Sequence, residues 1–107
     1  MDLETLLTGT KWEMLELLSK KKHSPLELAK KLNTSIANIS QQLRLLQTAG
    51  LVRREKTAKG GAGKPRTLFS VAHDFAFITV ISDGFAKKKL IRISSDQKKV
   101  LKQWTKD

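Results

Sequence analysis

Apolar residues in the first half of the chain recur at intervals of three and four positions in three successive segments. This spacing predicts amphipathic helices over about 10–20, 25–32 and 35–48. The residues expected to face the core are Trp12, Leu15 and Leu18 in the first segment, Leu26, Leu28, Ala29 and Leu32 in the second, and Ile36, Ile39, Leu43 and Leu46 in the third. Leu3, Leu6 and Leu7 precede these segments and predict a short helical turn that packs outward.

Polar residues with the chemistry of helix starts precede the helical segments. Thr10 with Glu13, and Ser24 with Glu27, are spaced as capping boxes, in which the two side chains bond free backbone amides of the first turn. Pro25 suits the first position of the second helix, because it has no amide hydrogen to leave unpaired. We therefore expect the second helix to begin sharply at Pro25.

Two short segments after the third helix predict an antiparallel ribbon over 51–57 and 67–71. The segment between them, AKGGAGKPR, contains glycine, proline and basic residues and no large apolar residue to bury. It therefore predicts an exposed basic loop that joins the two strands.

The last third of the chain favours a second hairpin. Residues 75–82 are rich in aromatic and β-branched side chains, Asp83-Gly84 is a turn signal, and the pattern resumes over 86–94. The alternative is a helix that starts at Asp74. Ser95 is placed to cap a final short helix, whose apolar edge must pack against another surface.

Three helices followed by a two-stranded ribbon with a basic loop predict an α+β fold, a winged helix-turn-helix with a C-terminal β-hairpin and a short helix. We expect two domains: the winged helix over 1–73, and a probable dimerisation element over 74–107. In this arrangement one helix enters the major groove of DNA, which is about 12 Å wide, and the ribbon, the wing, lies on the adjacent backbone or minor groove.

The charge of the chain supports a polyanionic partner. Its 107 residues carry 21 Lys and Arg against 10 Asp and Glu, a formal net charge of +11. Nucleic acid is the usual partner of such a surface, although a merely soluble lysine-rich surface is the plain alternative. Double-stranded DNA is therefore the expected partner.

The sequence lacks the residue patterns that metal sites, enzyme active sites and membrane spans require. There is no cysteine, and His23 and His73 are isolated histidines without a third ligand at suggestive spacing, so we expect no metal, no cofactor and no enzymatic activity. The apolar runs are far too short to span a membrane, and the first ten residues do not resemble a signal peptide. A cytoplasmic, nucleoid-associated protein is expected.

The candidate DNA contacts follow from the predicted arrangement. Asn and Gln amides form paired hydrogen bonds with adenine, a small apolar side chain contacts the thymine methyl group, and cations bind phosphates. The expected base contacts on the helix over 35–48 are Ala37, Asn38, Gln41 and Gln42, and its expected backbone contacts are Ser35, Ser40 and Arg44. In the wing, 57–66, the expected backbone contacts are Lys56, Lys59, Lys64 and Arg66, with Arg66 favoured for the minor groove.

The stretch from Pro25 to Arg54 resembles the ArsR-like winged-helix transcription regulators of bacteria and archaea. The motifs that carry the resemblance are LAKKL at 28–32, Ser35 followed by Ile39-Ser40 and Leu43, and Leu46 through Gly50-Leu51-Val52. It implies a homodimeric DNA-binding repressor whose dimer contacts come from the N- and C-terminal segments. Gln41-Gln42 stands where the family usually has Arg-His, and the cysteines of its metal-sensing members are absent.

We therefore expect a sequence-specific, dimeric transcription regulator. The alternatives are a nonspecific chromatin-type DNA-binding protein and a winged-helix module that docks proteins in a transcription or replication assembly. The sequence does not determine whether a small-molecule effector exists. The expected dimer contacts are apolar residues near the two ends of the chain, namely Leu3, Leu6, Leu7, Phe75, Phe77, Val100, Leu101 and Trp104.

Overall fold

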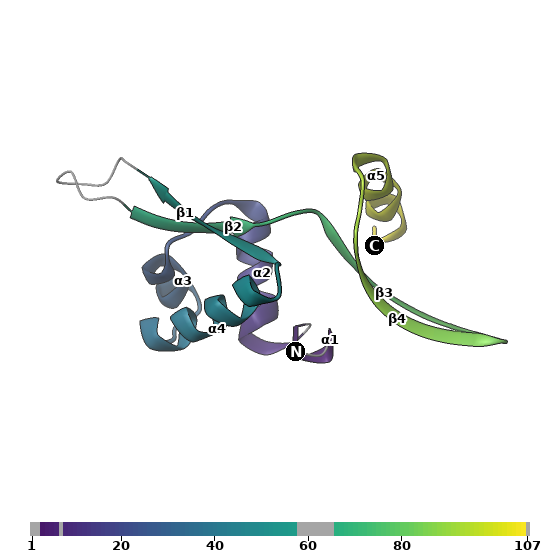
Figure 1. Cartoon of the computed structure of the whole chain (residues 1–107), viewed down its shortest axis with the longest axis horizontal. Helices are drawn as coiled ribbons and strands as arrows, with labels where there is room; N and C mark the ends of the chain where they lie inside the picture. The colour runs from purple at the N-terminus through teal and green to yellow at the C-terminus, as the bar shows by residue number, and fades with distance from the viewer. Residues whose placement is uncertain (1–2, 7, 58–65, 107) are drawn as a thin grey trace. The chain divides into compact units, whose positions relative to one another are not determined.

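The computed structural model describes residues 3–6, 8–57 and 66–106, which fall into two compact units, Met1–Ala72 and His73–Asp107 (Figure 1). The elements of the N-terminal unit are α1 (Leu3–Leu6), α2 (Gly9–Lys20), α3 (Pro25–Lys31), α4 (Ile36–Thr48), β1 (Val52–Thr57) and β2 (Arg66–Val71). Those of the C-terminal unit are β3 (Phe75–Ser82), β4 (Phe85–Arg92) and α5 (Ser95–Trp104). The predicted α+β fold and order of elements are confirmed.

The N-terminal unit is a helical layer covered by a two-stranded ribbon. Strands β1 and β2 pair antiparallel from Val52↔Val71 to Thr57↔Arg66. Helices α2, α3 and α4 lie against one side of this ribbon (Figure 1), where α2 and α3 contact β2 and α4 contacts β1. The loop predicted at 58–66 lies outside the described residues except for Arg66, which begins β2.

One narrow apolar stripe anchors α4 in this layer. Its buried residues Ile39, Leu43 and Leu46 recur at helical spacing, and Ile39 and Leu46 are completely buried. They belong to the same buried core as Met14 of α2 and Leu28 of α3. Full burial of such a side chain contributes about 1.5–3 kcal/mol, so the stripe fixes which side of α4 faces solvent.

A short β-bridge ties the start of α3 to the ribbon. The His23 amide donates to the Phe69 carbonyl at 3.1 Å, and the Phe69 amide donates back to the His23 carbonyl at 2.8 Å. Both residues are buried. The bridge therefore holds the first turn of α3 beside strand β2.

The predicted helix boundaries are correct for α3 and α4. Ser24 accepts the Glu27 amide hydrogen at 3.2 Å, and the Glu27 carboxylate accepts the Ser24 amide hydrogen at 2.9 Å, which completes the predicted capping box. Asn33 adopts a left-handed φ of 53° after α3, and Gly50 a φ of 79° after α4. The capping box predicted at Thr10 is wrong, because α2 begins at Gly9 with Thr8 at the N-cap.

Several apolar residues assigned to the core are exposed instead. Trp12, Leu26 and Ile36 are 42%, 47% and 49% exposed. Each lies at the edge of an apolar stripe whose centre is formed by other residues, Met14 and Leu18 in the case of α2. Helix periodicity finds the stripe, but the packing of neighbouring helices decides which residues at its edges are covered.

The C-terminal unit contains the predicted hairpin, and the alternative helix from Asp74 is wrong. Strands β3 and β4 pair from Phe75↔Arg92 to Ser82↔Phe85, which leaves Asp83 and Gly84 as the turn. Gly84 has a φ of 101°, a conformation that glycine adopts without strain. Helix α5 starts one residue earlier than expected, because Ser94, not Ser95, is its N-cap and forms a capping box with Gln97.

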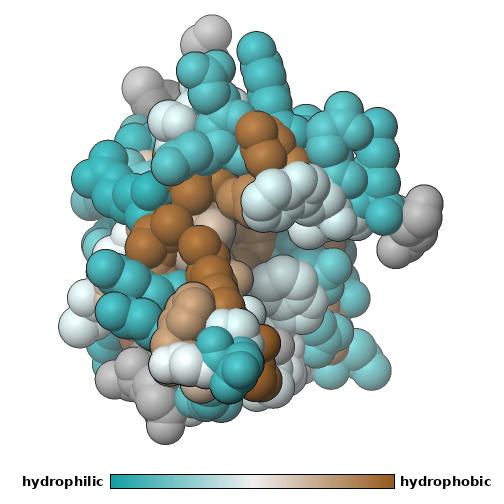
Figure 2. Space-filling view, turned by 90° about the vertical axis from the view of Figure 1, so that its right-hand side faces the viewer, coloured by the Kyte–Doolittle hydropathy of each residue, from teal (hydrophilic) through white to brown (hydrophobic). Residues whose placement is uncertain are grey.

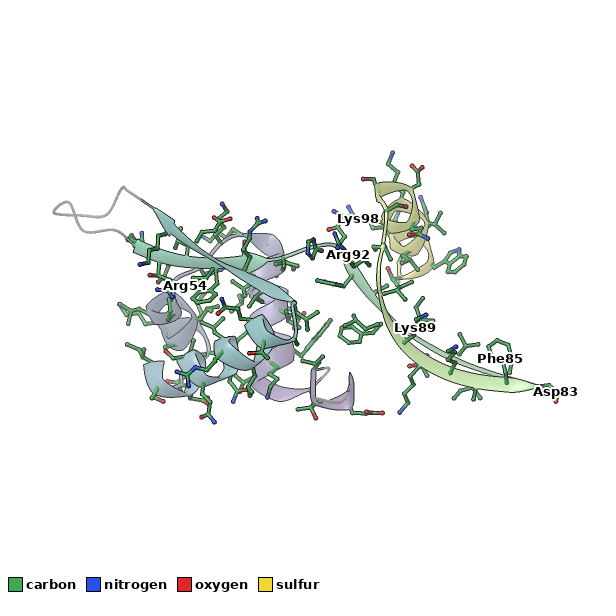
Figure 3. All side chains as sticks on the ribbon, in the orientation of Figure 1. Arg54, Asp83, Phe85, Lys89, Arg92 and Lys98 are labelled. Atoms are coloured by element: carbon green, nitrogen blue, oxygen red, sulfur yellow. The ribbon has the colours of Figure 1, made fainter. Side chains whose placement is uncertain are left out.

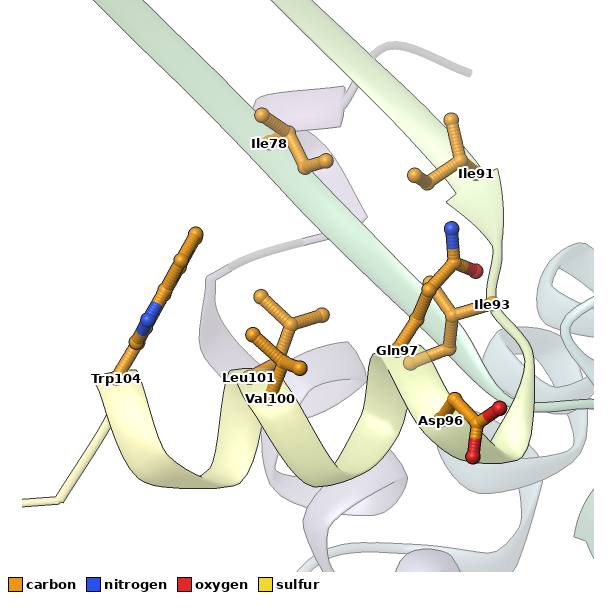
Figure 4. A pocket seen from close by; sticks show the side chains of 8 residues that line it. All are labelled: Ile78, Ile91, Ile93, Asp96, Gln97, Val100, Leu101 and Trp104. Carbon is orange, nitrogen blue, oxygen red and sulfur yellow. The ribbon is translucent and has the colours of Figure 1, made fainter.

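None of the described residues between His73 and Lys106 is buried. An apolar groove of about 310 Å³ separates α5 from the hairpin, with Val100, Leu101 and Trp104 on one wall and Ile78 and Ile91 on the other (Figure 4). Figure 2 shows apolar side chains gathered in a band among hydrophilic ones. An isolated two-stranded hairpin is marginally stable in water, so this apolar surface is expected to be covered.

The Ser24 cap provides a test of the local energetics. Ser24→Ala removes the acceptor for the Glu27 amide hydrogen and should lower the free energy of unfolding by about 1 kcal/mol. Thr10→Ala is the matched control and should leave stability unchanged or slightly higher, because Thr10 lies within α2. Denaturant titration followed by circular dichroism measures both changes. Equal losses in the two variants would contradict the assigned caps.

Candidate nucleic-acid interface

The side of α4 opposite the apolar stripe faces solvent. Ala37, Gln41 and Arg44 are exposed and follow one another at intervals of four and three residues, which places them on one helix face. An amide, a methyl group and a guanidinium therefore lie in one row. These groups are suited to base edges and phosphates in a major groove.

Two other predicted base contacts are occupied within the protein. Asn38 and Gln42 are half-buried, so the expectation that they share the open face with Gln41 is wrong. The Asn38 Nδ2 donates to the Thr34 hydroxyl at 3.0 Å, and the Gln42 Nε2 donates to the Asn38 Oδ1 at 3.3 Å. The buried Gln42 Oε1 accepts no hydrogen bond from the described residues. This row of side chains braces the first turns of α4.

Ser35 and Ser40, the two serines expected to contact the DNA backbone, lie at the start of α4 and within its second turn. Ser35 is the N-cap and accepts the Asn38 amide hydrogen at 3.0 Å. Ser40 is half-buried on the flank of the helix. Free amides at this helix start carry a partial positive charge, which favours a phosphate there.

A groove beside α4 contains a residue that the sequence analysis missed. It has a volume of about 310 Å³ and is lined by Pro25, Ser40, Leu43, Arg44, Gln47, Arg54, Thr67 and Phe69. Arg54 lies on β1 (Figure 3), two residues beyond the buried Val52 and therefore on the same strand face. Strand alternation is the signal that could have identified it. Arg44 and Arg54 give this groove two cations from different elements.

The basic residues of the ribbon divide into paired and unpaired ones. Arg66 forms an ion pair with Glu27 at 3.0 Å, and Arg53 forms one with Glu55 at 3.2 Å. Among the described residues, Arg54 and Lys56 have no ion-pair partner. The predicted wing residues Lys59 and Lys64 lie outside the described residues.

Both carboxylates that pair with these bases are held in the charged form. The Ser24 amide, followed by its hydroxyl and the Arg66 guanidinium, lowers the pKa of Glu27 below its ordinary value of 4.5. The hydrogen bond from Lys22, at 2.6 Å, is the main cause that lowers the pKa of Glu55. Burial opposes both shifts. Glu27 therefore remains charged and keeps Arg66 at the first turn of α3 at neutral pH.

Both histidines lie within hydrogen-bonding distance of other groups of the protein. His23 is buried and its Nδ1 lies 2.9 Å from the Lys21 carbonyl, while the His73 ring lies 3.0 Å from the Arg92 guanidinium. In the described part of the chain no three His, Asp or Glu residues gather where they could hold a metal ion. No helix in that part is long and apolar enough to cross a membrane.

Comparison with known protein families bears on the N-terminal unit. Residues 8–55, from the start of α2 into β1, match the family model described as a helix-turn-helix domain. The antiparallel strands β1 and β2 follow these helices and form the wing. The N-terminal unit has the winged helix-turn-helix fold.

Solved structures share this fold. Reduced HlyU from Vibrio cholerae N16961 is similar with a TM-score of 0.55 and 24% identity, over 65% of this chain and 67% of that one. The ferric uptake regulator from Francisella tularensis with iron is similar with a TM-score of 0.51 and 18% identity, over 97% and 80% of the two chains. A structure entitled "Structure of Prokaryotic Transcription Factors" is similar with a TM-score of 0.50 and 20% identity, over 92% of this chain and 79% of that one. No curated protein sequence matches the chain.

The residues expected at a dimer contact differ in exposure. Leu6 is buried, so the prediction that it packs outward is wrong. The side chain of Leu3 and all of Leu7 lie outside what the structure describes. In the C-terminal unit, Val100 and Trp104 are exposed, whereas Phe75, Phe77 and Leu101 are half-buried.

The lowered pKa of Glu27 makes a prediction for the winged helix-turn-helix domain. A carboxyl group with a depressed folded-state pKa stabilises the fold above its unfolded pKa, and this contribution disappears as the pH falls through the folded value. Glu27→Gln should therefore be less stable than the wild type at pH 7, and the difference should shrink below about pH 4.5.

Denaturant melts of both proteins at several pH values measure this difference. Glu16→Gln is the control, because Glu16 is exposed on α2 and has no ion-pair partner in the described part of the chain. A difference for Glu27→Gln that is independent of pH would contradict the proposed role of its charge.

Proposed function

We propose that the chain is a sequence-specific, double-stranded-DNA-binding transcription regulator that inserts α4 into the major groove. The outward row of Ala37, Gln41 and Arg44, opposite the buried stripe of the same helix, is the observation that carries the proposal. The match to a helix-turn-helix domain supports it. A helix presented in this way leaves its first turns free to contact base edges.

Each side chain of the interface has a distinct role in this proposal. Gln41 contacts a base through its amide, and Ala37 contacts a thymine methyl group. Asn38 contacts a base next to the one that Gln41 contacts. Gln42 holds the Asn38 side chain in position through their hydrogen bond. Backbone phosphates are bound by Ser35, Ser40, Arg44, Arg54 and Lys56, with Lys59, Lys64 and Arg66 extending these contacts along the wing.

The role of Gln41 yields a sharp test. Gln41→Ala removes a bidentate base contact, so preference at one base-pair position should relax by about 5- to 150-fold, the equivalent of about 1–3 kcal/mol. Selection of bound sites from random duplexes gives the wild-type preference, and competition binding at fixed salt gives the ratio for each variant. Gln103→Ala is the matched control, because Gln103 is exposed on α5 and lies outside α4 and the groove beside it.

The outcomes of that test separate the alternatives. Equal wild-type affinity for selected and random duplexes would replace sequence-specific regulation with a nonspecific chromatin function. An absence of duplex binding at low salt would favour a protein-docking module and would overturn the proposal.

We further propose that the regulator is an ArsR-like homodimeric repressor whose copies meet through the C-terminal unit. The groove between α5 and the hairpin is apolar and its wall residue Trp104 is 77% exposed. A second copy would cover such a surface by contacting it with the same surface of its own. Two copies of α4 would then occupy half-sites about 34 Å apart, one turn of the duplex.

Trp104 provides the test of dimerisation. Trp104→Ala removes the largest exposed apolar side chain at the groove and should shift the dimer toward monomer by at least ~10-fold in dissociation constant, since buried tryptophans dominate interfaces. Gln103→Ala, on the same helix, should leave the dissociation constant unchanged. Sedimentation equilibrium measures both. A wild-type protein that remains monomeric at micromolar concentration would contradict the dimer.

A further inference from the structure

The β3–β4 hairpin carries an unusual concentration of positive charge. Between Phe75 and Arg92 the chain has four basic residues and one acidic residue, Asp83 in the turn. The three lysines of β4 are consecutive and all exposed, and they lie opposite Ile78, Thr79 and Val80 of β3. Lys87 and Lys89 have no ion-pair partner in the described part of the chain. The winged helix-turn-helix domain does not account for these charges.

Strand geometry spaces the lysines regularly. Side chains alternate between the two faces, so Lys87 and Lys89 share one face at a separation of about 6.8 Å, and Lys88 lies on the other. One strand of duplex DNA rises about 3.4 Å per nucleotide. The separation of the two lysines on one face is therefore on the scale of the phosphate repeat, so both can bind phosphates of one duplex at the same time.

The tip of the hairpin is apolar and open to solvent. Ile81 is 83% exposed and Phe85 is 58% exposed. Ile81 pairs with Ala86 and Phe85 with Ser82, so the two apolar side chains lie on opposite faces beside the Asp83–Gly84 turn. Figure 3 shows Phe85 and Asp83 at the tip, with Lys89 farther along the strand and Arg92 at its base. The β3–β4 hairpin therefore has basic side chains along β4 and apolar side chains at its tip.

We propose that this hairpin, the β3–β4 ribbon, is a second duplex-DNA contact of the protein, independent of base sequence. Lys87 and Lys89 bind phosphates, and the tip at Ile81 and Phe85 enters a groove. A two-stranded ribbon fits the major groove, and apolar wedges at the minor groove insert between base steps. The inference rests on the proposed DNA-binding function and extends it to a second contact.

Charge favours DNA over a second copy of the chain as the partner of this ribbon. In a two-fold contact along β4, the lysines of one copy would face the same lysines of the other, and like charges placed opposite each other are destabilising. A polyanion such as DNA has the opposite charge and can contact the lysines on either face of the hairpin. None of these lysines lines the apolar groove beside α5, but Lys89 pairs with its wall residue Ile78, so the oligomeric state has to be followed together with DNA affinity.

The test compares two double variants of the full chain with equal charge change. Lys87→Gln with Lys89→Gln removes the proposed contacts, whereas Lys99→Gln with Lys102→Gln removes two exposed lysines of α5. Affinity for a labelled 30-base-pair duplex is measured from about 50 to 200 mM salt. Losing two phosphate contacts should reduce the slope of log affinity against log salt by about 1.8 and weaken binding ~10-fold or more on every sequence.

The outcomes distinguish this inference from the proposed function. If the wild type binds no duplex, the proposed function fails. If it binds and the two double variants lose affinity equally, only the ribbon contact is overturned. A change in oligomeric state by sedimentation in the Lys87/Lys89 variant would also overturn it, since the lysines would then act through assembly.

Phe85→Ser examines the tip separately. Because it removes no charge, it should weaken binding several-fold while leaving the salt slope unchanged. Affinity equal to that of the wild type would remove the tip from the contact.

Discussion

The apolar stripe of α4 is the constraint on which the candidate nucleic-acid interface depends. Ile39, Leu43 and Leu46 are buried, and a helix has only one orientation that buries all three. That orientation also fixes Gln41 and Arg44 on the solvent side. The same few residues therefore stabilise the N-terminal unit and determine which polar groups it presents, so a change in the stripe would alter both.

The C-terminal unit has no such buried stripe among its described residues, because none of these residues is buried. Its hairpin has a full ladder of backbone hydrogen bonds, but a net hydrogen bond contributes only about 1 kcal/mol and ordering a residue costs about as much or more. Local structure alone leaves little stability. The unit presents an apolar surface beside α5 and a basic surface on β4.

Features determined by neighbouring residues were predictable from the sequence. The capping box at Ser24, the left-handed residues at Asn33 and Gly50, and the turn at Asp83–Gly84 depend on residues within a few positions of one another. Features determined by distant residues were not. Arg66 is paired with Glu27, 39 positions away, and nothing in the local pattern around Arg66 indicates this partner.

The α4 face shows the same division. Gln41 and Gln42 are adjacent and chemically identical, yet Gln41 is exposed and Gln42 is half-buried against Asn38. A helical turn of about 100° per residue separates their environments. The sequence could identify the helix over 36–48 but could not say which amide it presents, because that depends on the rotation of α4 about its axis, set by packing against α2 and α3.

The distribution of ion pairs indicates what the unpaired cations do. An exposed ion pair contributes only about 0–1 kcal/mol, so pairing every cation would add little stability. Glu27 pairs with Arg66 of β2, and Glu55 pairs with Lys22 and with Arg53 of β1. By contrast, Arg54, Lys56, Lys87 and Lys89 have no ion-pair partner in the described part of the chain. Unpaired cations cost the fold little, and each one that meets a phosphate releases a counterion. In this chain, positive charge is therefore better explained by binding than by folding.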